Sequence, residues 1–387
     1  MFSRRTEWNL APNRLTIAHQ EALSSGSKII DLTISNPTHA KIKYDESAIL
    51  NALANPKALD YDPQPKGLRS AREAVANYYS SGSIIDPENL ILTTSTSEGY
   101  SFVFRLLCNP GDEVLVPKPS YPLFDFLADL QDVKLVPYSL IYDHGWQIDF
   151  QLLKTSITEK SRAIVLVHPN NPTGSYISVQ ERKQLNELCR RHKLALIVDE
   201  VFLDYVHDGE HRPTFAANED ALTFTLSGVS KISALPQMKL AWIAVSGPRA
   251  DVAAGMQRLE IIADTYLSLN APVQLAAPVL LDQRNAVQPQ LMNRVCANVA
   301  ELDHQLARQK SCSRLDVQGG WYAVLRIPVT RSDEDFAIEL LQRSGVLVHP
   351  GHFYDFPSDG YLVLSLIAVE EESQNGVSAV LDLANLL

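Results

Sequence analysis

Two apolar runs separated by a helix pattern decide the fold: Ala163 to His168 reads AIVLVH, and Leu194 to Val198 reads LALIV. Each run is almost continuously apolar and rich in branched side chains, which predicts a strand buried on both faces. Between the runs, Ser178 and Glu181 have the spacing of a capping box at the start of a helix. Two such strands joined by a helix form one right-handed βαβ unit.

The same alternation of strands and helices extends on both sides of this unit. Further strand patterns cover Asn89 to Thr94, Glu113 to Pro117, Thr223 to Leu226 and Leu240 to Val245, and a helix pattern covers Glu98 to Cys108. Buried strands that alternate with helices predict an α/β fold built on a doubly wound, mainly parallel sheet.

Three regions are predicted along the chain. Residues 1–44 form an irregular, polar arm that belongs to the smaller domain, and residues 45–282 form the large domain. After about Asp282 the pattern changes to a long polar helix, the pair Gly319-Gly320, short strands and an αβ tail. Residues 283–387 are therefore expected to form a smaller C-terminal α+β domain.

The composition narrows the partners and the compartment. The chain has 387 residues, 45% of them hydrophobic, and a formal net charge of −11. Such a charge argues against nucleic acid or an anionic membrane as a partner. The four cysteines are scattered without metal-ligand spacing, and neither a secretory signal nor a membrane-length apolar stretch is found. We therefore expect a cytoplasmic protein without a metal.

Polar residues follow two of the predicted strands, where a parallel sheet binds its ligands. Thr93 to Ser97 reads TTSTS between a strand and a helix, so hydroxyls and helix N–H groups could bind a phosphate. The alternative is ordinary helix capping. Asn170 to Gly174 reads NNPTG, in which an asparagine could donate a hydrogen bond from a rigid turn; the alternative is a turn that needs these residues for backbone reasons alone.

Two further strands end in charged residues. Asp199-Glu200 closes the LALIV run, where a carboxylate could pair with a protonated ring nitrogen or form a structural salt bridge. Ser227 to Lys231 reads SGVSK, and Lys239 follows eight residues later. A lysine in an apolar pocket can have a lowered pKa and attack a carbonyl as the free amine, whereas a lysine in a polar loop is usually solvated.

Together these features match the needs of pyridoxal 5'-phosphate (PLP), which requires a Schiff-base lysine, an acidic partner for its ring nitrogen and a phosphate cradle. The chain resembles, over nearly its full length, the class I/II aminotransferases of fold type I, the aspartate aminotransferase-like family. The resemblance rests on NNPTG, on Asp199 to Phe202 (DEVF), on SGVSK, on Pro119 to Pro122 (PSYP), and on Tyr61 ahead of Gly67-Leu68-Arg69.

The resemblance assigns a role to each of these positions. It implies that Lys231 carries the Schiff base and shuttles the proton, that Asp199 keeps the pyridine nitrogen protonated, that Asn171 binds the ring oxygen, and that Tyr121 stacks on the ring. The implied phosphate ligands are Ser95, Thr96, one of Ser227 or Ser230, and Lys239. Tyr61 would reach the phosphate of a partner subunit, which implies a homodimer with shared active sites.

Three positions depart from the family pattern. Lys239 stands in place of an arginine and loses its two-pronged geometry, and Phe202 stands in place of a tyrosine that donates to the ring oxygen. In Tyr361 to Ser365 (YLVLS), Val363 stands where the family has the arginine that binds the substrate carboxylate. Either another cation, such as one near Arg14 or in the partner subunit, takes this role, or the substrate lacks the usual carboxylate.

The leading hypothesis is a PLP-dependent aminotransferase that acts on an amino acid or a related small amine and a keto acid. A PLP-dependent lyase, decarboxylase or amine-modifying enzyme is the alternative, because the cofactor residues do not separate these reactions. A ligand-sensing domain of a transcription regulator is disfavoured, because the N-terminal arm is short and not basic. Neither G-x-x-x-x-G-K nor G-x-G-x-x-G occurs, which disfavours a P-loop or dinucleotide enzyme.

Overall fold

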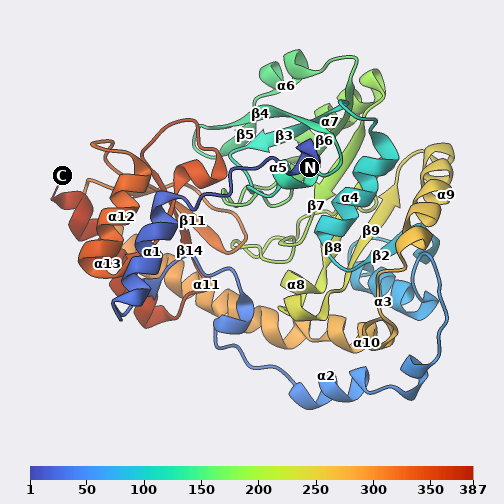
Figure 1. The fold of residues 1–387 in the computed structure, drawn as a ribbon, viewed down its shortest axis with the longest axis horizontal. Coiled ribbons are helices and arrows are strands. Elements are labelled where there is room, and N and C mark those ends of the chain that lie inside the picture. The colour runs from blue at the N-terminus through green and yellow to red at the C-terminus, as the bar shows by residue number, and fades with distance from the viewer. Residues whose placement is uncertain (387) are drawn as a thin grey trace.

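The computed structural model describes residues 1–386, which form two lobes (Figure 1). An eight-stranded sheet forms the centre of the larger lobe. In spatial order its strands are β2 (Leu90–Thr93), β9 (Ala241–Ser246), β8 (Thr223–Gly228), β7 (Ala195–Asp199), β6 (Ser161–Val167), β3 (Glu113–Lys118), β4 (Lys134–Tyr142) and β5 (Trp146–Ile148).

The sheet is mainly parallel, as the sequence predicts. Strands β8, β7, β6, β3 and β4 are parallel to their neighbours in this series. Strand β9 is antiparallel to both β2 and β8, and β5 is antiparallel to β4. Because β9 is reversed between them, β2 and β8 run in the same direction, and their carboxyl ends lie at the same edge.

Both faces of the sheet are buried, which explains the apolar runs. In β6, Ala163, Val165 and Val167 belong to one core, together with residues of α4 (Thr96–Leu107), α5 (Phe124–Asp129) and α9 (Arg249–Tyr266). Ile164 and Leu166 face the other way, toward α6 (Phe150–Ser156) and α7 (Val179–His192). Over β2 and β9 that second face is covered by α2 (Glu46–Leu53), α3 (Arg69–Tyr79) and α10 (Ala271–Asp282).

The smaller lobe is built around a four-stranded antiparallel sheet. Its order is β10 (Ser313–Arg314), β11 (Tyr322–Arg326), β14 (Tyr361–Ser365) and β13 (His349–Pro350). The sheet shares one core with α11 (Arg284–Leu306), α12 (Asp333–Ser344) and α13 (Glu370–Asn385). Helix α10 ends at Asp282 and α11 begins at Arg284; the domain boundaries at 44/45 and 282/283 stay predictions.

The first forty residues are more ordered than the sequence suggests. The expectation of an irregular arm is wrong for α1 (Arg14–Ser24), which begins at the capping residue Asn13 and buries Leu15 and Ala18. The apolar stripe of this helix is short, so it is stabilised chiefly by packing on α12, beside which it lies in Figure 1. Strand β1 (Ile30–Asp31) then pairs with β12 (Val346–Leu347) of the smaller lobe.

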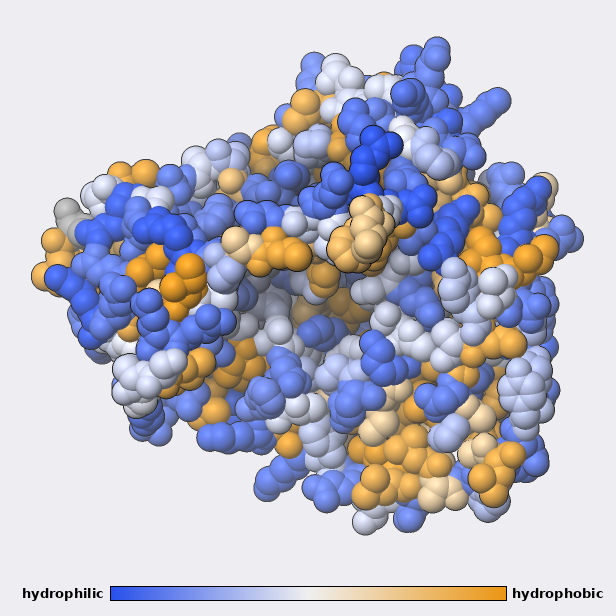
Figure 2. Space-filling view, in the orientation of Figure 1, coloured by the Kyte–Doolittle hydropathy of each residue, from blue (hydrophilic) through white to orange (hydrophobic). Residues whose placement is uncertain are grey.

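Figure 2 shows that the surface is hollowed between the two lobes. The carboxyl ends of the parallel strands point toward this region (Figure 1). Within residues 1–386, no helix combines the length and apolar character that crossing a membrane requires.

Candidate active site

A pocket of about 250 Å³ lies where strand ends of the large sheet meet the smaller lobe. The large sheet contributes residues at or just after the ends of β6, β7 and β8, together with the first turn of α4. The smaller lobe contributes Tyr322, and the segment after β1 contributes Ser35. The structure thus brings together the polar features that follow separate strands in the sequence.

Lys231 lies in the pocket on the short helix α8 (Val229–Ile232), directly after β8. Its Nζ donates a hydrogen bond to the Ser35 carbonyl oxygen at 3.0 Å. The same atom lies 4.8 Å from the ring centroid of Trp321 and 5.4 Å from that of Phe202. Burial among these groups lowers the pKa of Lys231 to about 8, although the charge of Asp199 opposes this shift. About a tenth of the amine is therefore uncharged and nucleophilic at pH 7, far more than for an ordinary lysine.

Asp199 ends β7 and also faces the pocket. Its carboxylate accepts hydrogen bonds from the Val201 backbone N–H at 3.2 Å and from the Tyr100 hydroxyl at 3.3 Å. Burial raises its pKa to about 6, and these two hydrogen bonds only partly offset the burial. A cationic N–H placed in the pocket would give this buried carboxylate a positively charged hydrogen-bond partner, as the protonated ring nitrogen of PLP would.

The first turn of α4 forms the part of the pocket that would suit an anion. Ser95 is the N-cap residue and accepts a hydrogen bond from the Glu98 backbone N–H, and Thr96 and Ser97 follow it. All three serine and threonine residues line the pocket, as does Ser230 beside Lys231. Helix N–H groups and four hydroxyls fit a phosphate at this place.

Asn171 and Tyr121 complete the part of the pocket that fits a planar ring. Asn170 connects the loop that contains Asn171 to the loop that contains Tyr121. Its side chain donates to the Pro119 carbonyl oxygen at 3.1 Å and accepts from the Ser120 hydroxyl at 3.2 Å. The Oδ1 atom of Asn171 is buried and has no hydrogen-bond partner within residues 1–386, so it fits a polar group of a ligand. Tyr121 lines the pocket and is 41% exposed.

The turn NNPTG also has the backbone role that the alternative interpretation gave it. Gly174 has a φ of +70°, and a Cβ at this residue would lie 2.5 Å from the Gly319 carbonyl oxygen. The glycine is therefore needed for the turn and for its close contact with the smaller lobe, while Asn171 faces the pocket.

Two expected phosphate ligands do not line the pocket. Ser227 is still part of β8, 1% exposed, and its hydroxyl donates to the Glu200 carbonyl oxygen at 3.4 Å. Lys239 has an exposed side chain and follows a 3₁₀ turn with a φ of +53°. The family resemblance implied Lys239 and one of Ser227 or Ser230 as phosphate ligands. The direction of the strand leaves Ser230 as the serine of this pair that faces the pocket.

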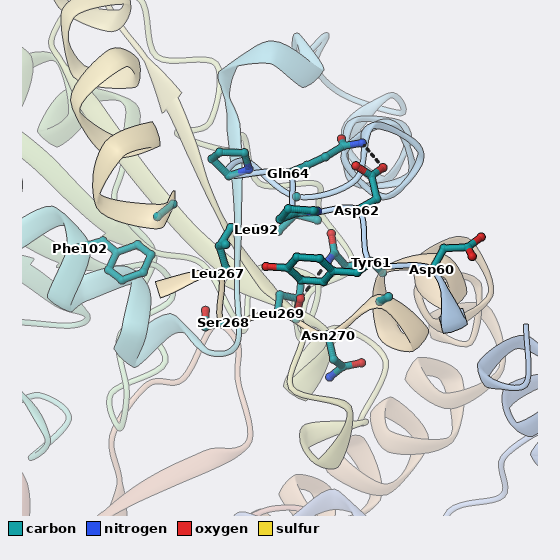
Figure 3. A pocket seen from close by; sticks show the side chains of 16 residues that line it. Asp60, Tyr61, Asp62, Gln64, Leu92, Phe102, Leu267, Ser268, Leu269 and Asn270 are labelled. Carbon is teal, nitrogen blue, oxygen red and sulfur yellow. Dashed lines mark hydrogen bonds between the residues drawn. The ribbon is translucent and has the colours of Figure 1, made fainter. Parts of the chain in front are cut away.

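Tyr61 lies outside the pocket as well. Its side chain is 85% exposed and borders a separate hollow of about 200 Å³, shown in Figure 3 together with Leu267, Ser268 and Asn270. This hollow adjoins the first turn of α4, since the Ser268 hydroxyl donates to the carboxylate of Glu98 in α4 at 2.9 Å. Within residues 1–386, the Tyr61 side chain is largely uncovered.

The sequence interpretation missed several residues around Lys231. Ser35 and Tyr322 line the pocket although they are 287 positions apart in the chain, and the Tyr205 hydroxyl donates to the Lys231 carbonyl oxygen at 2.6 Å. Tyr322 directly follows Gly319-Gly320-Trp321, but that motif alone does not indicate a pocket. No local pattern could have found these contacts, because Ser35 and Tyr322 reach the pocket from distant parts of the chain and Tyr205 contacts Lys231 from 26 positions away.

Arg14, suggested as a cation for the substrate, does not line the pocket of its own chain. Its guanidinium pairs with Glu334 at 3.5 Å and with Asp335 at 2.7 Å on the outside of α12. The helical structure of α1 orients Arg14 toward α12 and away from the pocket.

The chain belongs to the family of class I and II aminotransferases, whose model matches residues 27–374. Members of this family depend on PLP, so PLP is the cofactor of this enzyme, and the pocket contains groups that fit it. The chain is 29% identical over 367 residues to a glutamate–pyruvate aminotransferase of Haemophilus influenzae, with 91% of each chain covered. It is 28% identical over 360 residues to an alanine aminotransferase of Mycobacterium bovis, covering 89% of this chain and 84% of that one.

Solved structures support the fold. An alanine aminotransferase from Pyrococcus furiosus superposes with a TM-score of 0.90 over 100% of both chains at 22% sequence identity. An aminotransferase from Escherichia coli gives a TM-score of 0.86 at 24% identity, covering 99% of this chain and 98% of the other. The fold is therefore that of fold-type-I aminotransferases, and the chain is a PLP-dependent aminotransferase.

Proposed function

We propose that this aminotransferase works through Lys231 and Asp199, which face the same pocket. The supporting observation is that one pocket contains a lysine whose pKa is lowered to about 8 and a carboxylate whose pKa is raised to about 6, both by burial. Perturbed groups that face one cavity are typical of catalytic sites. When bound, PLP supplies a carbonyl carbon for the amine and a protonated ring that accepts electrons.

The remaining roles follow from position. Ser95, Thr96 and Ser230 would bind the phosphate, with the N-terminal N–H groups of α4. Asn171 would bind the ring oxygen, and Tyr121 would pack on the ring face. Lys231, once its Nζ is free again, would take the proton from the substrate carbon and return it, because its pKa lies close to working pH.

Replacement of Lys231 tests this assignment. Borohydride treatment of the wild type should leave PLP covalently attached at Lys231, and Lys231→Ala should lose turnover while it still folds and binds PLP. Lys239→Ala is the matched control, since Lys239 lies outside the pocket and its loss should leave the labelled peptide unchanged. A label on any other lysine would contradict the proposal.

We also propose a homodimer with shared active sites, in which Tyr61 reaches the phosphate bound by the partner subunit. Support comes from the exposure of Tyr61 and from exposed apolar side chains earlier in the same stretch of chain: Leu50 is 63% exposed and Leu59 is 91% exposed. Figure 2 shows an apolar patch at the lower right, over α2 and the segment that follows it. Such a patch is typical of an interface.

Mixed dimers test the sharing of sites. Tyr61→Ala and Lys231→Ala should each be weakly active or inactive alone. A hybrid of the two would contain one site with both native residues, so mixing after reversible dissociation should recover up to about a quarter of the wild-type activity. A monomer in solution, or no recovery from a hybrid of confirmed composition, would contradict the shared site.

The proposed substrates are an amino acid or a related amine and a keto acid, in the cytoplasm. The names of the two relatives support the first part, and the four cysteines, all unpaired, support a reducing compartment. A screen of amines against the PLP enzyme, read by conversion to pyridoxamine phosphate and release of a carbonyl product, tests the reaction. Cell fractionation tests the location.

A further inference from the structure

The pocket contains few charges for a substrate to meet. Among the residues within 1–386 that line it, Lys231 and Asp199 are the only ones with charged side chains. Both have proposed roles toward the cofactor, and the serine and threonine residues of the α4 turn have a role toward its phosphate. The groups that remain for the substrate are neutral and mostly aromatic or apolar, and they include Ser35, Val201, Phe202 and Tyr322.

Tyr322 is held beside the Lys231 amine by the small sheet. It is the residue of β11 that pairs with Ser365 of β14. The Ser365 hydroxyl donates to the Ile34 carbonyl oxygen at 2.6 Å, and the next carbonyl oxygen, that of Ser35, accepts from Lys231. A substrate whose amino group replaces the lysine amine would therefore place its neighbouring substituent near Tyr322.

Tyr354 belongs to the same buried core as Tyr322, and His349 contacts Tyr354. The His349 Nδ1 atom and the Tyr354 hydroxyl are 3.1 Å apart, and the Tyr354 carbonyl oxygen accepts from the Ser120 backbone N–H at 2.9 Å. Burial raises the pKa of Tyr322 and Tyr354 and lowers the pKa of His349. All three side chains are therefore uncharged at neutral pH.

The sheet face that carries Tyr322 presents no cation toward the pocket within the described chain. Val363 pairs with both Val324 and His349, and directly paired residues project to the same face of a sheet. Val363 is 1% exposed. Arg326, at the far end of this face, is exposed and lies over the ring of Tyr361. A carboxylate against this wall would lose hydration without gaining a cationic partner.

We propose that the uncharged pocket wall at Tyr322 selects amines whose substituent beside the reacting carbon is uncharged, such as amino-acid amides or amino alcohols, over free amino acids. The phenol hydroxyl of Tyr322 can donate to an amide carbonyl or accept from an alcohol without a charge to balance. The inference rests on the proposed site at Lys231. In the half-reaction, the amino group of the substrate and the aldehyde oxygen of PLP change places, giving a ketone or aldehyde and pyridoxamine phosphate.

Three matched substrates test the selectivity of the holoenzyme. L-Alanine, L-alaninamide and L-alaninol differ only in the group beside the reacting carbon. Single-turnover loss of the PLP absorbance, with detection of the carbonyl product, should give kcat/KM at least about tenfold higher for the amide and the alcohol than for alanine. Equal or faster conversion of alanine would overturn this inference and leave the proposed function standing, even if a cation of the partner subunit binds the carboxylate. Failure of every amine to convert PLP would refute the proposed function and this inference with it.

Variants of the wall test where the selectivity arises. Val363→Arg should lower the ratio of kcat/KM for alaninamide to kcat/KM for alanine by at least about tenfold. Val363 lies two positions before Ser365, the strand partner of Tyr322. Residues two apart on a strand are separated by about 7 Å, which is within reach of an arginine side chain. Val363→Leu is the matched control and should leave the ratio unchanged. If Val363→Arg does not fold, Tyr322→Arg provides a second test, because it places the cation directly on the wall. Tyr322→Phe is its control. Folded arginine variants that bind PLP but keep the wild-type ratio would overturn the assignment.

Discussion

Replacing Asp199 with asparagine should separate the cost of the carboxylate in folding from its use in catalysis. Burial raises the pKa of Asp199 from its ordinary value of 3.8 to about 6. The folded, cofactor-free protein therefore binds the proton more tightly than the unfolded chain, and this group lowers stability as pH rises from about 4 to about 6. Above that range, the cost of keeping the carboxylate ionised is at most about 3 kcal/mol.

The asparagine variant avoids this cost and keeps the shape of the side chain. Its oxygen can still accept from the Val201 N–H, while its NH₂ group can donate to the Tyr100 hydroxyl. In cofactor-free protein we expect a gain in the free energy of unfolding of about 1.5 kcal/mol at pH 5 and up to about 3 kcal/mol at pH 8. Paired urea titrations at the two pH values measure this gain.

The same variant should lose activity once PLP is bound. Loss of a hydrogen bond to a charged group costs about 1.5–3 kcal/mol, which corresponds to a fall of at least about 10- to 100-fold in the proton-transfer step. Glu200→Gln is the control: Glu200 is an adjacent buried carboxylate that accepts from Thr214 and the Phe215 N–H and does not line the pocket. A destabilised Asp199→Asn protein at pH 8, or near wild-type turnover, would refute the reasoning.

The cofactor-free enzyme should take up PLP at a rate that rises with pH through about 8, because burial lowers the pKa of Lys231 to that value and only the uncharged amine attacks. Stopped-flow absorbance measures this rate. An inflection near the ordinary lysine pKa of about 10.5 would contradict the prediction. In Asp199→Asn, loss of the opposing charge should move the inflection to lower pH. Gly174→Ala should destabilise the protein by about 1–3 kcal/mol, because Gly174 has a positive φ and lies against Gly319. Gly26→Ala is the control: Gly26 has a φ of +76° but open space around it, so this change should cost about 1 kcal/mol. Urea titration measures both values. Ser178→Ala should cost about 1 kcal/mol by loss of the α7 cap, and an unchanged unfolding midpoint would show that the cap contributes little.

The sequence by itself determined the elements that hold the cofactor groups. Continuous apolar runs such as AIVLVH indicate strands covered on both faces, and β6 is indeed packed on both sides. Polar residues directly after such runs must lie at one edge of a parallel sheet, so Asp199, Asn171 and Lys231 could be expected to meet. The physical reason is local: strand burial, turns and caps depend on residues close together in the chain.

Only the tertiary structure decided what surrounds these groups. The reversal of β9 leaves no mark in its apolar pattern, since antiparallel and parallel buried strands share the same composition. The helix at Arg14 depends on α12 for its packing, so its own sequence resembles a polar arm. Ser35 and Tyr322 reach Lys231 because the two lobes meet there. Contacts between residues hundreds of positions apart depend on how the lobes pack, and that packing sets both the pKa of Lys231 and the neutral wall beside it.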